Sequence, residues 1–261
     1  MTFLTALLSI ASGSLVGFTL GLVGGGGSIL AVPLLVYVVG VNSPHVAIGT
    51  SAIAVAVSAA TNLIGHARAN TVKWPCALVF AAAGVAGAFF GAQLGKIIDG
   101  SKLLTLFGLL MVIVGASTLV PRKSTGNPAI ALTYKTMPRL LPLLTGVGFL
   151  VGALSGFFGI GGGFLIVPGL MGATTMPLLN AVGSSLVSVT AFGLATAASY
   201  AWSGLIDWHL AGLFIVGGAF GGLLGIKLGK RLSGHKRVFA LTFSSVVIAV
   251  GLYVIVRSIV F

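Results

Sequence analysis

Long apolar stretches with almost no charge make up most of this chain. Hydrophobic residues account for 57% of the 261 residues and charged residues for only 6%, whereas about 25% of the residues of a soluble domain are charged. The apolar stretches are continuous and lack the alternation of apolar and polar residues that marks the strands of a membrane barrel. Because a helix satisfies its own backbone hydrogen bonds inside lipid, we expect an all-α integral membrane protein.

A tandem duplication is visible in the sequence. The run GLVGGGGSILAVPLL at 21–35 matches GFFGIGGGFLIVPGL at 156–170, and AIGTS at 47–51 matches AVGSS at 181–185. Trp74 matches Trp208, and Lys96 matches Lys230, in the same register as the second pair of blocks. The expected organisation is therefore a first transmembrane repeat at 1–120, a basic linker at 121–139 and a second transmembrane repeat at 140–261, which together form one unit.

Each half is expected to hold five helical segments. In the first half these are 3–23, 27–40, 44–65, 73–96 and 101–120, separated by glycine, proline and polar turn signals. The second segment would cover about 20 Å at 1.5 Å per residue, which is less than the ~30 Å hydrocarbon core of a bilayer. We therefore expect a Gly-broken short half-helix in each repeat. Both five crossings per half and three crossings with a re-entrant pair fit this pattern.

Basic residues outnumber acids by 14 to 2, and their placement favours inverted repeats. Lys and Arg collect in the cytoplasmic loops of membrane proteins. Inverted halves would place 11 basic residues on the side of the linker and 3 on the other, whereas parallel halves would divide them 7 to 7. We therefore expect two inverted repeats, a cytoplasmic linker and a multi-pass protein of the cell inner (plasma) membrane. Because the charges are scattered between apolar segments, no nucleic acid partner is expected.

The two glycine runs are the expected binding site. A helix that begins inside the membrane exposes about four unpaired N–H groups and a positive dipole end, which together attract an anion. Positive φ angles are expected at Gly26 and Gly161, where glycine also lets a ligand approach the backbone. Hydroxyls of the two G-[TS]-S blocks would add donors, unless they bond to carbonyls of their own helix. The expected substrate-binding residues are Gly24, Gly25, Gly26, Gly27, Ser28, Thr50, Ser51, Gly159, Gly161, Gly162, Gly163, Ser184 and Ser185.

Three further polar residues are candidates for the pathway: Asn62 in the third segment, and Gln93 and Lys227 at matching positions of the two fourth segments. Polar residues within a membrane are functional candidates by default. The alternatives are a packing hydrogen bond for Asn62 and snorkelling of Lys227 to the membrane surface. Four scattered His, one Cys and two acids indicate no metal set, paired carboxylates or proton relay. No catalytic residue, metal or cofactor is therefore expected, and an intramembrane enzyme is disfavoured.

The doubled glycine-proline motif, the PHVAIGTSA and LNAVGSSLV blocks and GLIDWHLA resemble the TauE/SafE sulfite-exporter family of membrane anion transporters over nearly the whole chain. The first motif has four glycines where G-I-G-G-G is the more usual form. The resemblance implies a multi-helix inner-membrane carrier, and members of the family are linked to sulfite, sulfonates and other sulfur-containing or organic anions.

The function expected from the repeats and the resemblance is that of a secondary membrane transporter. It would export small anions, such as sulfite or organosulfonates, by alternating access between the two inverted repeats. An anion channel and a non-transporting membrane scaffold are the alternatives. The expected partners are the small anionic substrate, the lipid bilayer and, if the chain oligomerises, a second copy in a homodimer.

Overall fold

The computed structural model describes residues 3–119, 136–161, 163–231 and 236–260, and within these ranges the chain is helical without a β-strand. The five segments expected in each half are confirmed, with ends that agree to within a few residues. The first half consists of α1 (Phe3–Val23), the 3-10 helix η1 (Gly24–Leu30), α2 (Ala31–Pro33), the π-helix η2 (Leu34–Val38), α3 (Pro44–Arg68), α4 (Trp74–Ile97) and α5 (Gly100–Leu119). The second half consists of α6 (Met137–Phe158), α7 (Gly163–Thr174), α8 (Leu178–Trp202), α9 (Trp208–Arg231) and α10 (Lys236–Val260).

Eight of the described helices are long and apolar enough to cross a membrane. The two shorter apolar helices, Gly26–Val38 and Gly163–Thr174, are the predicted half-helices. At 1.5 Å per residue, the 12 residues of α7 cover about 18 Å, which is too short for the ~30 Å hydrocarbon core. The chain is therefore a multi-pass membrane protein in which each half combines four helices of spanning length with one short helix.

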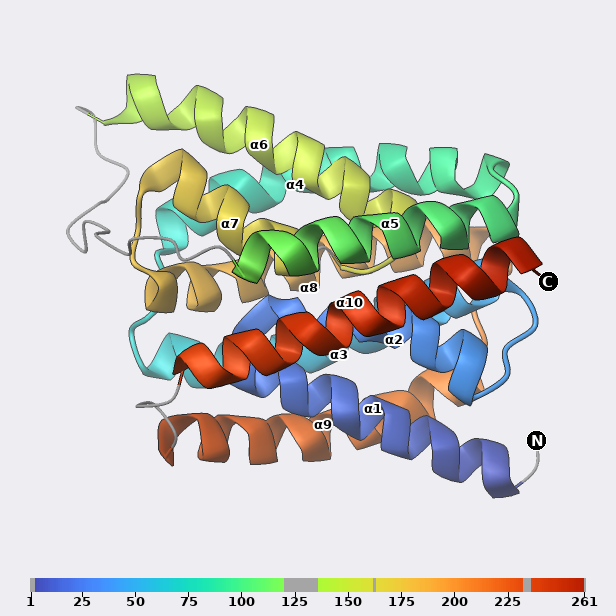
Figure 1. The fold of residues 1–261 in the computed structure, drawn as a ribbon. Coiled ribbons are helices and arrows are strands. Elements are labelled where there is room, and N and C mark those ends of the chain that lie inside the picture. The colour runs from blue at the N-terminus through green and yellow to red at the C-terminus, as the bar shows by residue number, and fades with distance from the viewer. Residues whose placement is uncertain (1–2, 120–135, 162, 232–235, 261) are drawn as a thin grey trace.

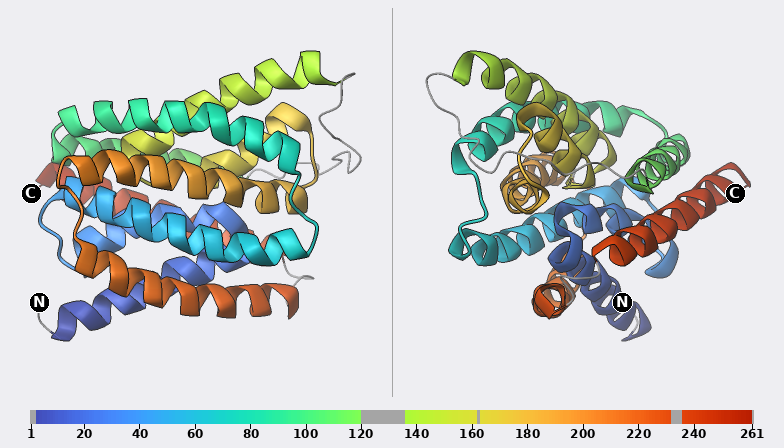
Figure 2. Two further views of the ribbon diagram at one scale, coloured as in Figure 1. Left: turned by 180° about the vertical axis from the view of Figure 1, so that it is seen from behind. Right: turned by 60° about the vertical axis from the view of Figure 1, so that its left-hand side comes forward.

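The bundle has two distinct ends (Figure 1). We call the end at which α1 begins and α10 ends the termini end, and the end at which α5 ends and α6 begins the linker end. The short helical segment that follows α1 turns back toward the termini end, and α7 turns back toward the linker end. Seen from behind, α3 and α8 lie side by side in the middle of the bundle and run in opposite directions (Figure 2).

Helices from different halves pack together. α1 packs along α9, and α6, the counterpart of α1, packs along α4, the counterpart of α9. Likewise α3 packs against α8, and α5 against α10. Every one of these pairings is unchanged when the two halves are exchanged, which extends the sequence repeat into a repeat of tertiary contacts.

Glycines allow two of these helix pairs to approach until their backbones touch. A Cβ atom added at Gly91 of α4 would overlap the carbonyl oxygen of Ala153 in α6, and one added at Gly221 of α9 would overlap the carbonyl oxygen of Ser14 in α1. The Ser14 hydroxyl also donates to the Gly217 carbonyl across the second pair, at 3.1 Å. Small residues allow the backbones of membrane helices to approach in this way, and we call these two contacts the glycine seams.

The two acids of the chain cap helices. The Asp99 carboxylate accepts a hydrogen bond from the backbone N–H of Ser101 at 3.0 Å, at the start of α5. The Asp207 carboxylate accepts from the backbone N–H groups of His209 and Leu210, both at 3.0 Å, at the start of α9. Caps of this kind satisfy N–H groups that have no partner within the helix. Both carboxylates therefore lie at helix ends rather than in the middle of a span.

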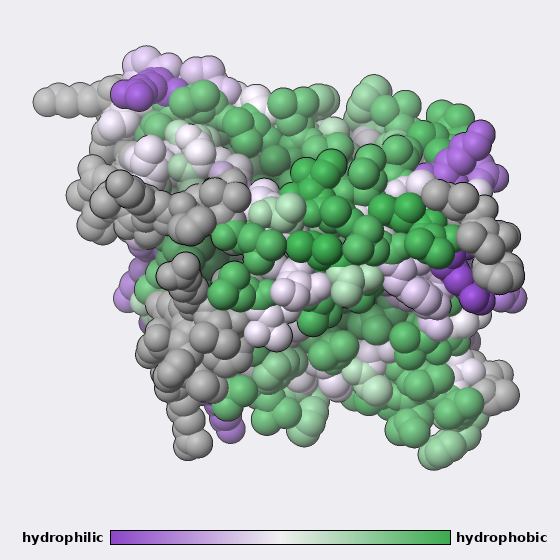
Figure 3. All heavy atoms as spheres, viewed as in Figure 1, coloured by the Kyte–Doolittle hydropathy of each residue, from purple (hydrophilic) through white to green (hydrophobic). Residues whose placement is uncertain are grey.

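The surface matches a bilayer setting. Hydrophobic residues cover the middle of the face shown in Figure 3, and hydrophilic residues gather toward its two ends. Trp74 begins α4 at the linker end, whereas Trp202 and Trp208 lie at the termini end, and all three rings are exposed. Tryptophan is enriched at both membrane–water interfaces, so these rings mark the two borders of the apolar band.

Candidate functional site

The second glycine run interrupts the helical structure at the centre of the bundle. α6 ends at Phe158, Gly159 and Gly161 have φ angles of 67° and 62°, and α7 begins at Gly163. Only glycine adopts this left-handed conformation without a steric penalty. The positive φ expected at Gly161 is confirmed, and Gly162, a predicted binding residue, lies outside the described residues.

The break lies between the two central helices. A Cβ atom added at Gly161 would stand 3.0 Å from Cγ1 of Val55 in α3 and 3.3 Å from Cγ1 of Val189 in α8. Val55 and Val189 occupy equivalent positions in the register of the two repeats. Gly161 is therefore placed between matching positions of the two halves.

The first glycine run has a different local structure. The helical structure continues from α1 through the 3-10 helix η1, which contains Gly24, Gly25, Gly26 and Gly27. Residues of a 3-10 helix have φ angles near −60°, so the positive φ expected at Gly26 is not found. A Cβ atom added at Gly27 would meet the backbone N of Leu20, so this run packs tightly onto α1. Ser28 follows in the same 3-10 helix and is completely buried.

The second hydroxyl of each G-[TS]-S block bonds within its own helix. The Ser51 hydroxyl donates to the Ile48 carbonyl at 2.9 Å, and the Ser185 hydroxyl donates to the Val182 carbonyl at 2.8 Å. Ser51 also lies 3.3 Å from the carbonyl oxygen of Gly159. Ser51 therefore connects α3 to the glycine break.

The first hydroxyl of each block connects the two halves. Oγ1 of Thr50 accepts a hydrogen bond from the backbone N–H of Asp207 at 3.0 Å, and Oγ of Ser184 accepts one from the backbone N–H of Lys73 at 2.9 Å. Lys73 and Asp207 are equivalent positions of the two repeats, as are Thr50 and Ser184. Each of these hydroxyls thus holds the start of the third long helix of the other half, α9 for Thr50 and α4 for Ser184.

Ser155 is a buried polar residue near the break that the sequence did not single out. It lies four residues before Gly159, is fully buried, and its hydroxyl has no hydrogen-bond partner among the described residues. Its counterpart in the first repeat is Leu20, so a comparison of the repeats cannot reveal it. A serine one helical turn before a glycine break was the available signal.

The three pathway candidates occupy different environments. Asn62 is 4% exposed and lines a cavity of about 90 Å³ between α3 and α9. Gln93 and Lys227 are exposed on α4 and α9, so they do not share the buried environment of Asn62. A basic residue not predicted for the pathway, Lys96, donates from Nζ to the Ser199 carbonyl at 3.3 Å.

A helix N-terminus inside a membrane bundle, such as that of α7, has the chemistry to attract an anion. The N-terminus of α7 presents its first N–H groups and its positive dipole end at the centre of the bundle, next to Gly161. Desolvated N–H groups at a helix start are good donors to an oxyanion. Among the described residues, there is no group of three or more His, Cys, Asp or Glu side chains that could hold a metal ion.

A membrane-spanning helical bundle with short interrupted helices at its centre defines an integral membrane protein of the transporter type. The family model for the sulfite exporter TauE/SafE family matches residues 9–254, and the chain belongs to this family. It is 53% identical over 258 residues to a probable membrane transporter protein of Xylella fastidiosa, a match that covers 99% of this chain and 98% of the relative.

More distant relatives have the same kind of name. The chain is 26% identical over 270 residues to the probable membrane transporter protein YunE of Bacillus subtilis, covering 97% of this chain and 98% of the relative. It is also 26% identical over 260 residues to a probable membrane transporter protein of Methanocaldococcus jannaschii, covering 92% and 93%. No solved structure is a significant match. These relatives are named as membrane transporters rather than as enzymes, in agreement with the sequence prediction.

Proposed function

We propose that this protein is a secondary carrier of small anions, with sulfur-containing oxyanions such as sulfite or organosulfonates as its substrates. The observation that carries the proposal is the break at 159–161, after which a helix N-terminus lies between the two central helices of a membrane bundle. A carboxylate-free site built from backbone N–H groups suits an anion. Membership of the sulfite exporter family supports the choice of sulfur oxyanions.

We further propose that the two halves are inverted repeats that work by alternating access. This is supported by the opposite directions of α3 and α8 and by the exchange of helix partners between the halves. It is also supported by the charges. Arg68 and Lys73 lie at the linker end with the linker itself, whereas Lys96, Lys102 and Arg257 lie at the termini end. By the positive-inside rule, the linker end faces the cytoplasm of a cell inner membrane.

The test is a flux assay with purified protein in liposomes. Sulfite, taurine-like sulfonates and thiosulfate are offered in turn, with chloride and a monovalent cation as controls. We expect saturable, slow flux of at least one sulfur oxyanion and a higher thermal midpoint in its presence, because binding stabilises the folded state. Absence of both flux and binding for every anion would refute the proposal. Single-channel currents would instead indicate a channel.

A further inference from the structure

Two buried polar side chains occupy matching positions in the two halves and lack partners. Asn62 in α3 and Thr196 in α8 are equivalent in the register of the repeats and are 4% and 0% exposed. Nδ2 of Asn62 and Oγ1 of Thr196 have no hydrogen-bond partner among the described residues. Burial of an unpaired donor destabilises the folded state. Such a group in a native protein therefore calls for an explanation, and among the unpaired buried groups of the described residues these two occupy equivalent positions of the two repeats.

Both residues belong to a stripe that begins at the glycine break. On α3 the spacing 51, 55, 58, 62 follows one face of a helix, and the residues are Ser51, Val55, Ser58 and Asn62. Ser51 bonds to the Gly159 carbonyl, and Val55 lies against Gly161. The α3 stripe thus leads from the break to Asn62, in the direction of the linker end.

The stripe on α8 leads the opposite way. Its members, Ser185, Val189, Phe192 and Thr196, are the equivalents of the α3 stripe in the second repeat. Val189 lies against Gly161, and α8 runs antiparallel to α3 (Figure 2). The α8 stripe therefore leads from the same break to Thr196, in the direction of the termini end.

The space beside Asn62 is open. Thr61, Gly218, Ala219 and Leu223 line the cavity of about 90 Å³ together with Asn62. A Cβ atom added at Gly218 would stand 2.5 Å from the Ser58 hydroxyl, so this polar group packs directly against the glycine backbone beside the cavity. A cavity of this size, with polar groups on its wall, holds a few waters or one small oxyanion.

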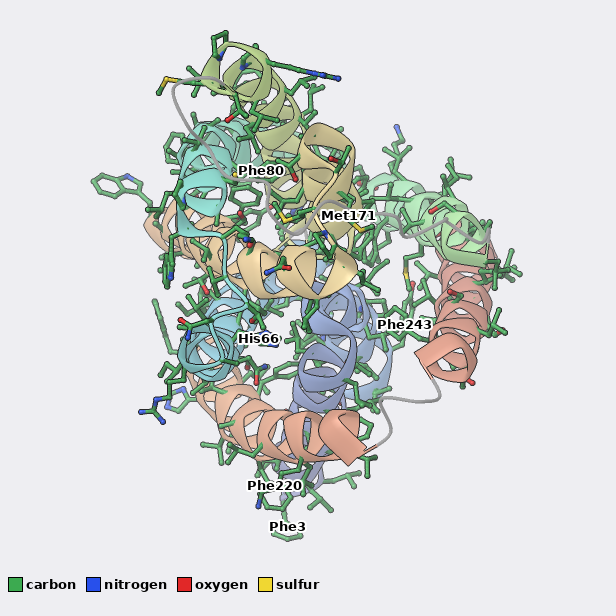
Figure 4. All side chains as sticks on the ribbon, turned by 90° about the vertical axis from the view of Figure 1, so that its left-hand side faces the viewer. Phe3, His66, Phe80, Met171, Phe220 and Phe243 are labelled. Atoms are coloured by element: carbon green, nitrogen blue, oxygen red, sulfur yellow. The ribbon has the colours of Figure 1, made fainter. Side chains whose placement is uncertain are left out.

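An aromatic ring lies on the α8 stripe between the break and Thr196. The position that matches Ser58 is Phe192, whose ring stacks on Phe80 of α4 with centroids 6.3 Å apart and an interplanar angle of 23°. A Cβ atom added at Gly84 would overlap the Phe192 ring. Figure 4, viewed from the linker end, shows Phe80 on the inner side of α4, in contrast to Phe220 on the outer surface.

We propose that Asn62 and Thr196 are equivalent anion-contacting residues on the two sides of the central break, and that Phe192 closes the route to Thr196. An amide NH₂ and a hydroxyl can each donate a hydrogen bond to a passing oxyanion, which explains why both stay unpaired in the protein alone. This inference rests on the proposed carrier function and adds the two routes that lead to its central site.

The first test compares two threonine variants of α8. Thr196→Val removes the unpaired hydroxyl while conserving volume, and Thr190→Val removes a hydroxyl that already bonds to the Leu186 carbonyl at 2.8 Å. We expect Thr196→Val to raise the half-saturating anion concentration about tenfold or more, as the loss of a hydrogen bond to a charged group predicts. Its thermal midpoint should be unchanged or higher, because an unpaired buried group is lost. Thr190→Val should transport like the wild type.

The second test uses Asn62. Asn62→Leu removes the donor, and Asn62→Thr introduces the residue that the other repeat carries. We expect loss of transport for Asn62→Leu and substantial recovery for Asn62→Thr. If Asn62 had only a structural role, Asn62→Leu would transport better than Asn62→Thr, because Leu fills the space and leaves no polar group unpaired. Equal transport by both variants at wild-type half-saturation would overturn the inference.

The third test addresses the closed route. Phe192→Leu should change the maximal rate several-fold and leave the half-saturating concentration unchanged, since a gate acts on a conformational step. Phe107→Leu is the control, because Phe107 is equally buried and packs on Phe158 with centroids 5.8 Å apart, away from the α8 stripe. Equal effects of the two substitutions would refute a gating role. Absence of anion flux by the wild-type protein would refute the carrier function itself. If the wild type is active and Thr196→Val and Asn62→Leu transport like it, only this inference is refuted.

Discussion

The substitution Gly161→Ala tests whether the backbone at this position contacts the ligand or only requires the conformational freedom of glycine. Gly161 has a φ of 62° and lies between Val55 and Val189. A left-handed L-residue costs about 1–2 kcal/mol, of which about 0.4–1 kcal/mol is offset by the stiffer unfolded chain. The new Cβ atom would lie 3.0 Å from Cγ1 of Val55, and overpacking of this kind costs about 1–3 kcal/mol. The free energy of unfolding should therefore fall by about 1–5 kcal/mol.

The effect on transport should exceed the effect on folding. A methyl group at Gly161 occupies the space through which an anion would reach the first N–H groups of α7. Loss of one hydrogen bond to a charged ligand costs about 1.5–3 kcal/mol, which corresponds to a roughly ten- to hundredfold weaker affinity. We expect the half-saturating anion concentration of the folded protein in liposomes to rise by this factor. Thermal unfolding is measured on the same preparation.

The matched control is Gly204→Ala. Gly204 has a φ of 69°, and nothing lies within 4 Å of its added Cβ atom, so this variant carries the backbone strain without the crowding. It should lose about 1 kcal/mol of stability and retain wild-type affinity. If Gly161→Ala transports with wild-type half-saturation, the anion does not approach this backbone and the assignment of the site is wrong.

Three further outcomes follow from the fold. Thr50→Val should lower the free energy of unfolding by about 1–3 kcal/mol, because the N–H of Asp207 loses its acceptor; thermal unfolding in detergent measures it. Gly91→Leu should abolish assembly of the folded bundle, since its side chain overlaps the Ala153 carbonyl; size-exclusion chromatography of the solubilised protein reports this. Hydrogen bonds from Ser101 hold the pKa of Asp99 below its ordinary value, so its capping of α5 is fully present above about pH 4 and is lost as the pH falls through the lowered pKa. Asp99→Asn should remove this acid-dependent loss, which unfolding at a series of pH values detects.

Each of these predictions has a control within the chain. Thr61→Val removes a hydroxyl that bonds to carbonyls of its own helix, at 2.7 and 3.1 Å, and should change stability much less than Thr50→Val. Gly172→Leu adds a side chain where no atom lies within 4 Å of the added Cβ and should leave assembly intact. An acid profile that is identical in the wild type and Asp99→Asn would contradict the capping argument.

Much of the fold is predictable from local physical chemistry. Turn signals such as Ser43 before Pro44 and Asp99 before Gly100 mark helix starts because their side chains and φ angles suit a cap. The helix ends agree with these signals to within a few residues. The repeat is equally visible, because both halves must build the same packing surfaces from the same residue types.

The details of the site are less predictable, because they depend on contacts between distant segments. The hydroxyl of Thr50 accepts from the start of a helix in the other half of the chain, and no local pattern reveals that partner. The two glycine runs look alike, yet Gly161 is left-handed and Gly26 is part of a 3-10 helix. Packing against α1 determines the backbone conformation of the first glycine run, whereas the second run lies between α3 and α8.

The glycine seams determine which helices can move together. Each seam joins a helix of one half to a helix of the other, with backbones in direct contact. The moving bodies of a transport cycle would thus each contain chain from both halves, rather than one half each. A half made alone would leave a glycine groove open on its first and third long helices, and a second half in the opposite orientation would close both grooves. Fragments 1–127 and 128–261, expressed together, should therefore assemble, whereas either fragment alone should be degraded or aggregate.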